Sequence, residues 1–446
     1  MNSGLNDLRG AKCRIFGLGR SNEALISYLV KQGADIFVSD KRKSEKEITD
    51  ILQKNGIKNA KILPYDLPKK TDFLFRTPFL RPDSKEITDN LALGSRLSSE
   101  VELFLAKAKG KIYGITGSDG KTTTTTITYH LLKKKNSDNT YIGGNIGTPL
   151  ISFIDKLAND SVTVCELSSF QLMTVQDSPH CSALTNITPN HLDWHKNMAE
   201  YIASKLKIFG SRTQKTVFSQ KNLDSDLTPV YKKDIITFFA GENSNGVGIT
   251  DGHISYFGEK LLDVSKIKLV GEHNVLNFMT AIALVYPEVT IKDIESVACE
   301  LQGVEHRIEL IAEKNGVKFY NSSIDSTPSR TLATLKCFSS KSVILICGGY
   351  DKNLDYDEFA VKSQKAVRKY VLCGDNKWKI YNSLITHGVP LEDVLISSSF
   401  FGAVTHATEV ARLGEAVLLS PASASFDMFV NFEERGIAFK NIIKTM

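Results

Sequence analysis

A glycine-rich turn, TGSDGKT at residues 116–122, holds the residue types best suited to chemistry in this chain. It follows a short apolar segment and precedes a helical pattern, the context in which backbone N–H groups at a helix start bind phosphates. The Lys121 ammonium suits the β- and γ-phosphates of a nucleoside triphosphate, and the Thr122 hydroxyl is a ligand type for Mg²⁺. The strict GxxxxGK spacing is not met, because Ile115 stands where glycine is required and Gly114 lies one place early. We therefore predict a variant P-loop, with a chance glycine-rich turn as the alternative.

A second glycine turn lies near the start of the chain. Gly17-x-Gly19-x-x-Asn22 resembles the dinucleotide fingerprint, except that asparagine replaces the third glycine. Asp40 ends the next apolar segment at the distance expected of a ribose-binding acid. The broken fingerprint makes a nicotinamide cofactor the less favoured interpretation. A generic nucleotide-phosphate site and a plain tight turn both remain open.

Acid and histidine side chains follow the apolar segments further along the chain. Glu166 ends the run VTVC, at the carboxyl end of a predicted strand, where sites of α/β proteins form; a solvated acid fits equally well. His191 and His195 have a spacing found in zinc ligands on a helix. No glutamate follows His191, as a metalloprotease would require, so zinc is disfavoured.

Lys205 interrupts a mostly apolar line. Met198, Tyr201 and Ile208 share that line at helical steps of three and four residues, whereas Lys207 is predicted to face away. A semi-buried ammonium is costly unless it is paired or neutralised. A snorkelling lysine is the alternative, and the residues alone favour it.

The elements that must position these residues alternate between strands and helices. Units of strand and glycine turn begin near residues 13, 111 and 343 and predict three α/β domains, joined near residues 97 and 304. The length of 446 residues fits three domains. With 42% hydrophobic and 24% charged residues, the composition excludes a disordered chain and a coiled-coil rod. The net charge of +5 without a long basic run argues against a nucleic-acid partner.

Cysteine usage and apolar runs indicate the compartment. The seven cysteines are irregularly spaced and form no CxxC, so a disulfide framework and a zinc ribbon are disfavoured. No signal peptide is visible in MNSGLNDLRGAKCRIFG, and no apolar run approaches the ~18 residues of a membrane span. We expect a protein of the reduced cytoplasm.

Several motifs occur together in the order of one family. They are Gly114–Thr122 (GITGSDGKT), Gly143–Gly147 (GGNIG), Glu166–Gln171 (ELSSFQ), His191–Asp193 (HLD), Gly271–Asn274 (GEHN) and His306-Arg307. Together they resemble the Mur ligases, the ATP-dependent amide-bond ligases of peptidoglycan precursor synthesis. Glu166–Leu172 and Leu419–Gly436 resemble more narrowly the branch that adds D-glutamate. The resemblance covers nearly the whole chain and is weakest in the first domain.

This resemblance implies an α/β fold of three domains. It implies a Rossmann-like N-terminal domain for the UDP-sugar nucleotide (1–96), a P-loop-type central ATP-binding domain (97–303) and a Rossmann-like C-terminal domain for the amino acid (304–446). The implied reaction uses ATP to convert the carboxylate of UDP-N-acetylmuramoyl-L-alanine into an acyl phosphate, which the amine of D-glutamate attacks. Mg²⁺ is the implied cofactor. We expect a cytoplasmic monomer with small-molecule substrates, no nucleic-acid partner and no membrane span.

The resemblance also implies a role for individual residues. Catalytic roles are implied for Lys121, His191, Lys205 and Arg307. ATP contacts are implied for Gly117, Ser118, Asp119, Gly120, Lys121, Thr122, Thr123, Asn274 and Arg307. Mg²⁺ contacts are implied for Thr122, Glu166, His191 and Lys205, the last as a carbamate. Sugar-nucleotide contacts are implied for Gly17, Gly19, Asp40 and Asn145, and D-glutamate contacts for Lys352, Ser425 and Phe432. A general-base role of His191 towards the amine is the alternative to its metal role.

The chain departs from the family pattern at four positions. Asn190 replaces a common aspartate, Ser322 replaces the acid that holds the adenosine ribose, and Ile324 replaces a functional lysine. Phe79 stands near a common glycine, and Arg330 is a candidate replacement for the missing lysine. Two other interpretations remain. One is a relative that adds glutamate to a folate, which leaves the first glycine turn without a role. The other is a nucleotide-binding protein that the substitutions at 322 and 324 have made inactive.

Overall fold

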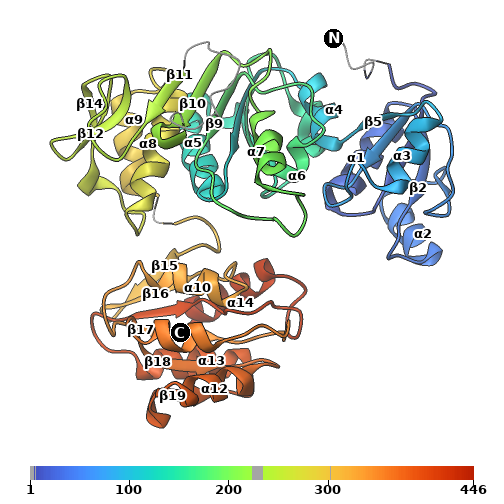
Figure 1. The fold of residues 1–446 in the computed structure, drawn as a ribbon. Helices are drawn as coiled ribbons and strands as arrows, with labels where there is room; N and C mark the ends of the chain where they lie inside the picture. The colour runs from blue at the N-terminus through green and yellow to red at the C-terminus, as the bar shows by residue number, and fades with distance from the viewer. Residues whose placement is uncertain (1–4, 6, 223–234, 302) are drawn as a thin grey trace. The chain divides into compact units, whose positions relative to one another are not determined.

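The computed structural model describes residues 5, 7–222, 235–301 and 303–446 (Figure 1). It contains three β-sheets of five, nine and six strands, each covered by helices. The chain divides into two compact units, the first comprising Met1–Lys266 and His273–Val297, the second Ile267–Glu272 and Ala298–Met446. The first unit holds the first two sheets, and the second unit holds the third. The joins predicted near residues 97 and 304 stay predictions.

The first sheet is parallel, with strand order β3-β2-β1-β4-β5. Its strands are β1 (Lys12–Phe16), β2 (Asp35–Ser39), β3 (Lys61–Ile62), β4 (Phe73–Arg76) and β5 (Arg96–Ser98). Its helices are α1 (Arg20–Lys31), α2 (Glu45–Lys54) and α3 (Lys85–Ala92). Successive strand residues alternate between two buried faces: Ile15 packs with α1 and α2, whereas Phe16 packs with Ile87 of α3. The strand order reverses between β1 and β4, so their carboxyl ends form the crevice typical of nucleotide sites.

The second sheet has the order β14-β13-β12-β11-β10-β9-β6-β8-β7. Its strands are β6 (Lys111–Thr116), β7 (Thr140–Gly144), β8 (Val162–Glu166), β9 (Cys181–Leu184), β10 (Lys215–Ser219), β11 (Ile235–Phe238), β12 (Gly246–Thr250), β13 (His253–Tyr256) and β14 (Glu259–Asp263). The helices are α4 (Glu100–Lys107), α5 (Lys121–Asn136), α6 (Ser169–Leu172), α7 (Met198–Leu206), α8 (His273–Val285) and α9 (Ile291–Glu300). Strands β6 to β12 are parallel, and β13 and β14 add an antiparallel edge.

Helix α5 forms in spite of its sequence. Residues 122–126 are five consecutive threonines, whose branched side chains have poor helix propensity. Thr123, Thr124 and Thr125 are nevertheless buried, and α5 packs against α8 and strands β7 and β8. Tertiary packing thus outweighs local propensity and fixes the helix that follows the predicted phosphate turn.

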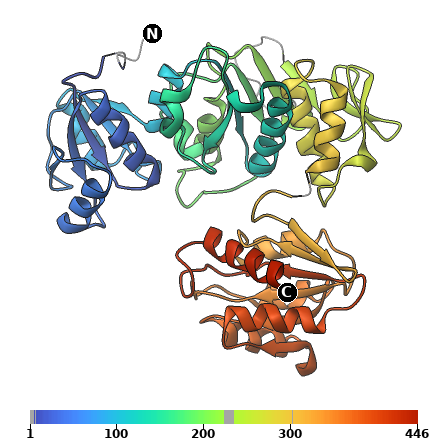
Figure 2. The ribbon, with the colours of Figure 1, turned by 180° about the vertical axis from the view of Figure 1, so that it is seen from behind.

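The third sheet has the order β15-β16-β20-β17-β18-β19, parallel except for the β15–β16 pair. Its strands are β15 (Glu309–Lys314), β16 (Val317–Asn321), β17 (Val343–Cys347), β18 (Val367–Leu372), β19 (Val394–Ile396) and β20 (Ala416–Leu419). Its helices are α10 (Pro328–Leu335), α11 (Asp357–Ser363), α12 (Lys377–Thr386), α13 (Phe400–Val410) and α14 (Phe432–Thr445). Helices α10 to α12 cover one face and α13 and α14 the other, as Figure 2 shows from behind. Within the described ranges, no helix is long and apolar enough to cross a membrane.

Candidate active site

The predicted phosphate turn joins β6 to α5 in a conformation that requires two of its glycines. Gly117 and Gly120 have φ angles of 151° and 76°, in the region that favours glycine. A Cβ at Gly117 would lie 1.8 Å from Thr185 Oγ1, and one at Gly120 would lie 2.4 Å from Asn277 Oδ1. Gly120 caps α5 without a side-chain hydrogen bond. The N–H groups in the first turn of a helix can bind an anion.

The polar residues of the turn contact one another and the segment that follows β9. Lys121 Nζ donates to the carbonyl of Ser118 at 2.9 Å, across the turn. The Ser118 N–H donates to Asn186 O at 2.9 Å, and the Asp119 N–H to Asn186 Oδ1 at 2.8 Å. Thr122 is half-buried at the start of α5. The turn is therefore held from outside by the segment that follows β9.

Glu166 lies at the carboxyl end of β8, and one of its two carboxylate oxygens has no hydrogen-bond partner. The residue is 1% exposed, and its Oε1 accepts from Asn145 Nδ2 at 2.7 Å. Its Oε2 is buried and has no hydrogen-bond partner. An orphaned buried carboxylate oxygen is costly and suits a cation. Asn145, predicted to contact the sugar nucleotide, thus also orients Glu166.

Mg²⁺ fits this donor set better than a cation enclosed by protein alone. Among the described residues, no group of three or more His, Cys, Asp and Glu side chains could hold a metal ion. Mg²⁺ uses one or two carboxylates and takes its remaining ligands from phosphates and water. Glu166, with its orphaned Oε2, supplies such a carboxylate beside the phosphate turn.

Lys205 is buried against the phosphate turn. It is 2% exposed, its Nζ donates to Gly117 O at 2.6 Å, and its ammonium lies 4.6 Å from the Tyr201 ring centroid. Burial, reinforced by the neighbouring Lys121 ammonium, lowers the pKa of Lys205 to about 6. The snorkelling alternative is therefore wrong. Lys207 is exposed, as predicted, and donates to Met173 O at 2.5 Å.

Two residues around the turn were not predicted. The Tyr201 hydroxyl lies 2.8 Å from Ser118 Oγ. Asn277 Oδ1 accepts from Thr124 Oγ1 at 3.2 Å, and Asn277 Nδ2 donates to Asn274 Oδ1 at 2.9 Å. Asn274 is thereby linked to the start of α5. Tyr201 precedes Lys205 by one helical turn, a signal that the sequence carried, whereas nothing local marked Asn277.

The two histidines have different surroundings. His191 is exposed, has a φ of 54°, and places its ring centroid 4.8 Å from that of Phe170. His195 is buried, with Nε2 3.0 Å from Ser169 Oγ, and burial lowers its pKa. Residues 191–195 form turns, not a helix, so the helical zinc spacing does not exist. Asn190 Oδ1 accepts the His191 N–H at 2.9 Å and steadies this loop.

The side chains of Asn22 and Asp40 hold the first glycine turn through hydrogen bonds to its backbone. Gly17 has a φ of 84°, and a Cβ there would lie 2.9 Å from Thr77 Cγ2, whereas a Cβ at Gly19 would meet nothing within 4 Å. Asn22, in place of the third glycine, donates to Gly17 O at 2.8 Å. Asp40 accepts the Leu18 N–H at 2.6 Å and two further N–H groups. Burial raises the pKa of Asp40, but these N–H groups outweigh it and lower the pKa.

The predicted D-glutamate residues come from two adjoining loops and a helix start in the second unit. The loop that holds Lys352 pairs with the loop that holds Ser425, because the Tyr350 N–H donates to Ala424 O at 3.0 Å. Lys352 is exposed and Ser425 is buried. Phe432 begins α14, and its carbonyl accepts from Ser323 Oγ at 2.8 Å.

Models of known families match three consecutive parts of the chain. The MurD N-terminal domain matches residues 12–85, the Mur ligase middle domain residues 115–285, and the Mur ligase, glutamate ligase domain, residues 306–423. The UDP-N-acetylmuramoylalanine–D-glutamate ligase of Clostridium botulinum (strain Langeland) is 41% identical, over 98% of this chain and 97% of the relative. That of Clostridium kluyveri is also 41% identical with the same coverage. The chain belongs to the Mur ligase family.

Solved Mur ligases share the fold. The ligase MurC of Thermotoga maritima matches with a TM-score of 0.59 and 20% identity, over 98% of this chain and 99% of that one. The ligase MurF of Thermotoga maritima, solved in complex with ADP, matches with a TM-score of 0.55 and 16% identity, over 99% of this chain and 97% of that one. The family and the three-domain α/β fold class predicted from the sequence are thus confirmed.

The departures from the family pattern have local explanations. Phe79 is 68% exposed and has no positive φ, so its backbone does not need glycine; its ring centroid lies 5.2 Å from that of Phe170. Ser322 is buried, and its hydroxyl accepts the Ile308 N–H at 3.3 Å. Arg330 Nη1 donates to Ile324 O at 3.3 Å, so its guanidinium lies against the backbone of the residue that replaces the lysine. Arg307, predicted to contact ATP, is half-buried, and its N–H donates to Val304 O at 2.8 Å.

Arg435 fastens the loops of the second unit together. It is 1% exposed, and its guanidinium donates to Ser323 Oγ and O and to the carbonyls of Ser423 and Ala424, at 2.9–3.1 Å. Burial lowers the pKa of Arg435 to about 10, which leaves it charged at neutral pH.

Replacement of Arg435 by methionine is expected to destabilise the second unit by about 3 kcal/mol, because buried carbonyls lose their donor. Arg435→Lys is expected to keep part of that stability, and Arg412→Met, which removes an exposed cation of the same unit, should change it little. Trp378 and Trp194 are the only tryptophans of the sequence. In a Trp194→Phe background, the tryptophan fluorescence measured during urea denaturation therefore reports on the second unit alone. Equal midpoints for Arg435→Met and Arg412→Met would contradict the assigned role.

Proposed function

We propose that this chain is an ATP-dependent ligase that joins D-glutamate to UDP-N-acetylmuramoyl-L-alanine in cytoplasmic peptidoglycan precursor synthesis. The observation that carries the proposal is a buried lysine, Lys205, in contact with a phosphate turn. The names of the curated relatives support the choice of substrates. The first domain would bind the sugar nucleotide through the turn at Gly17 and Gly19, with Asp40. Asn145 would contact the same substrate, and the protein would act as a monomer.

The first chemical step needs cations around the γ-phosphate. A carboxylate oxygen of the sugar nucleotide attacks the γ-phosphorus, an acyl phosphate forms and ADP leaves. Both reactants are anions, so the rate depends on positioning and on neutralised charge. Lys121 would hold the phosphates together with the N–H groups at Gly120 and the start of α5, because the N–H groups of Ser118 and Asp119 already donate to Asn186. Arg307 would add a second cation. Asn274 and Thr123 complete the proposed ATP contacts.

In the second step the D-glutamate amine attacks the acyl carbon, phosphate leaves, and the amine loses its proton. Lys352, Ser425 and Phe432 would hold D-glutamate. His191 is exposed and lies three residues after Thr188, whose N–H donates to Ser118 Oγ at 2.9 Å. It would act either as a metal ligand or as the base that takes the proton. We favour the metal role.

Mg²⁺, when bound, supplies charge neutralisation on the triphosphate. Glu166, whose Oε2 has no partner, would hold it together with Thr122 Oγ1 and His191. Lys205, neutral above pH 6, is in the state that reacts with CO₂: its Nζ bonds to the carbon and releases a proton, which leaves a carbamate anion. This anion would serve as a further ligand. The carbamate would thereby replace an ammonium that is costly to bury with an anion that can bind the metal.

The proposal is tested by measuring ADP release with a panel of amino acids in the presence of ATP, Mg²⁺ and UDP-N-acetylmuramoyl-L-alanine. We expect release only when D-glutamate is present as well. Turnover with L-alanine, a diamino acid or a folate instead would assign the chain to another branch. Nucleotide binding without ADP release under all conditions would mean that the substitutions at 322 and 324 have silenced the enzyme.

A further inference from the structure

A loop of the first domain, residues 77–84 between β4 and α3, extends from the first glycine turn to the central domain. We call it the bridging loop. At its start, the Thr77 N–H donates to Phe16 O at 2.9 Å, and Thr77 Cγ2 fills the space that a side chain at Gly17 would need. The position of the bridging loop is therefore tied to the shape of the turn at Gly17.

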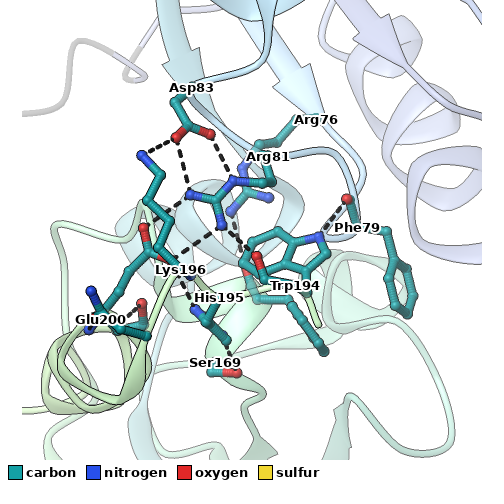
Figure 3. A network of polar contacts seen from close by, with 12 residues as sticks. Arg76, Phe79, Arg81, Asp83, Ser169, Trp194, His195, Lys196 and Glu200 are labelled. Carbon is teal, nitrogen blue, oxygen red and sulfur yellow. Dashed lines mark hydrogen bonds and ion pairs between the residues drawn. The ribbon is translucent and has the colours of Figure 1, made fainter. Parts of the chain in front are cut away.

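Further along the bridging loop, Arg81 forms an ion pair with Glu200 of helix α7 in the central domain (Figure 3). Its Nη1 and Nη2 donate to Glu200 Oε2 and Oε1 at 3.1 and 2.9 Å, and Nη1 also donates to Trp194 O at 2.6 Å. Asp83 binds the other side of the guanidinium at 2.8 and 3.0 Å, and Lys196 Nζ approaches Asp83 Oδ2 at 2.5 Å. Bidentate guanidinium–carboxylate pairs fix orientation as well as distance.

Helix α7 carries this contact to the phosphate turn. Glu200 lies in its first turn, and the next residue, Tyr201, places its hydroxyl 2.8 Å from Ser118 Oγ. Lys205, one turn further along, donates to Gly117 O at 2.6 Å. A shift of Glu200 therefore moves two side chains that brace the phosphate turn, because α7 is a continuous helix.

We propose that Arg81 and Glu200 are positioning residues that couple the sugar-nucleotide site of the first domain to the phosphate turn of the central domain. The inference rests on the proposed function, which assigns the turn at Gly17 to the sugar nucleotide. Binding there would act on the bridging loop, through Arg81 on α7, and through Tyr201 and Lys205 on the ATP site. Coupling of this kind is reciprocal, so ATP must tighten sugar-nucleotide binding by the same factor.

The structure also provides a second anchor and a matched control. Arg76 Nη2 donates to Phe170 O at 2.7 Å, so the two domains stay fastened when Arg81 is removed. Lys31 and Asp155 form another ion pair between the same domains, at 3.5 Å, but both are well exposed and neither lies in the bridging loop or α7. Loss of the Lys31 pair should leave the coupling intact.

The test measures the Kd of a non-hydrolysable ATP analogue, adenylyl imidodiphosphate with Mg²⁺, in the absence and presence of saturating UDP-N-acetylmuramoyl-L-alanine. For the wild-type chain we expect the sugar nucleotide to lower this Kd by about 5- to 150-fold. Arg81→Ala and Glu200→Ala should each reduce the factor to about one, and the double variant should lose no more. Arg81→Lys, which keeps one hydrogen bond, should retain part of the factor, and Lys31→Ala should retain all of it.

Three outcomes would overturn the inference. The first is a wild-type chain that binds both ligands independently, and the second is coupling that persists in Arg81→Ala and Glu200→Ala. The third is an equal loss of coupling in Lys31→Ala, since any weakened domain contact would then suffice. A sugar nucleotide that fails to bind the wild-type chain is a separate result: it refutes the proposed function, and the coupling falls with it.

Discussion

Lys121→Ala is expected to lower kcat by about 10³-fold, because the substitution removes the cation that we propose contacts the γ-phosphate. Lys121 Nζ already lies within the turn, 2.9 Å from Ser118 O, so little rearrangement is needed to reach a phosphate. The Kd for ATP should rise as well. Phosphate release with all three substrates measures kcat, and calorimetric titration measures the Kd.

The control for this prediction is Lys135→Ala. Lys135 is exposed in the last turn of the same helix, α5, so its removal changes the net charge equally but leaves the phosphate turn intact. Activity should stay near that of the wild type. Unchanged turnover and nucleotide affinity in Lys121→Ala would rule out this turn as the phosphate site.

Lys205→Ala is expected to lower kcat by about 10²-fold or more, because the site would lose the carbamate anion proposed for this lysine. Small carboxylic acids such as acetate should restore part of the activity, since they can bring a carboxylate into the cavity left by the side chain. Lys207→Ala, a change at the exposed lysine two residues further on, should have little effect. Full activity of Lys205→Ala without added acid would show that the lysine has no chemical role.

The pH dependence of Lys205 follows from its pKa of about 6. Below that pH the amine takes a proton and cannot react with CO₂, so bicarbonate-dependent activity should fall as the pH drops through 6. Stability changes in the same direction. In the unfolded chain the lysine stays protonated up to about pH 10.5. Burial of the ammonium therefore lowers the free energy of unfolding by its full amount below pH 6, and by less as the pH rises. Urea denaturation in CO₂-free buffer should show that Lys205→Met is more stable than the wild type at pH 6, and that this difference in stability is smaller at pH 9.

Local patterns were sufficient for the parts of the site that lie at strand ends and on one helix face. The phosphate turn and Glu166 follow apolar runs, and Lys205 stands out because it breaks a periodic line. Residues that complete the site from a distance gave no such signal. Asn277 reaches Thr124 across 153 positions, and Arg81 reaches Glu200 across 119. A periodic pattern shows which face of an element is buried, but it does not show which distant loop that face meets.

The zinc interpretation shows that a local spacing misleads when the segment does not form the expected secondary structure. A spacing of four residues places His191 and His195 side by side only if the segment is helical, and these residues form turns instead. The side chain of Glu166 is a second example. The sequence indicated an acid at a strand end, but only the packing of Asn145 against Oε1 reveals that the other oxygen is left without a partner.

The contacts of Arg435 bear on how amino-acid choice evolves in such enzymes. All of its partners, from Ser323 to Ala424, belong to the second unit. The loops proposed to recognise the incoming amino acid are thus built and braced within one inheritable segment. A lineage could exchange or retune the loops that Arg435 joins, and so accept a different amino acid, while the phosphate turn of the first unit stays unchanged.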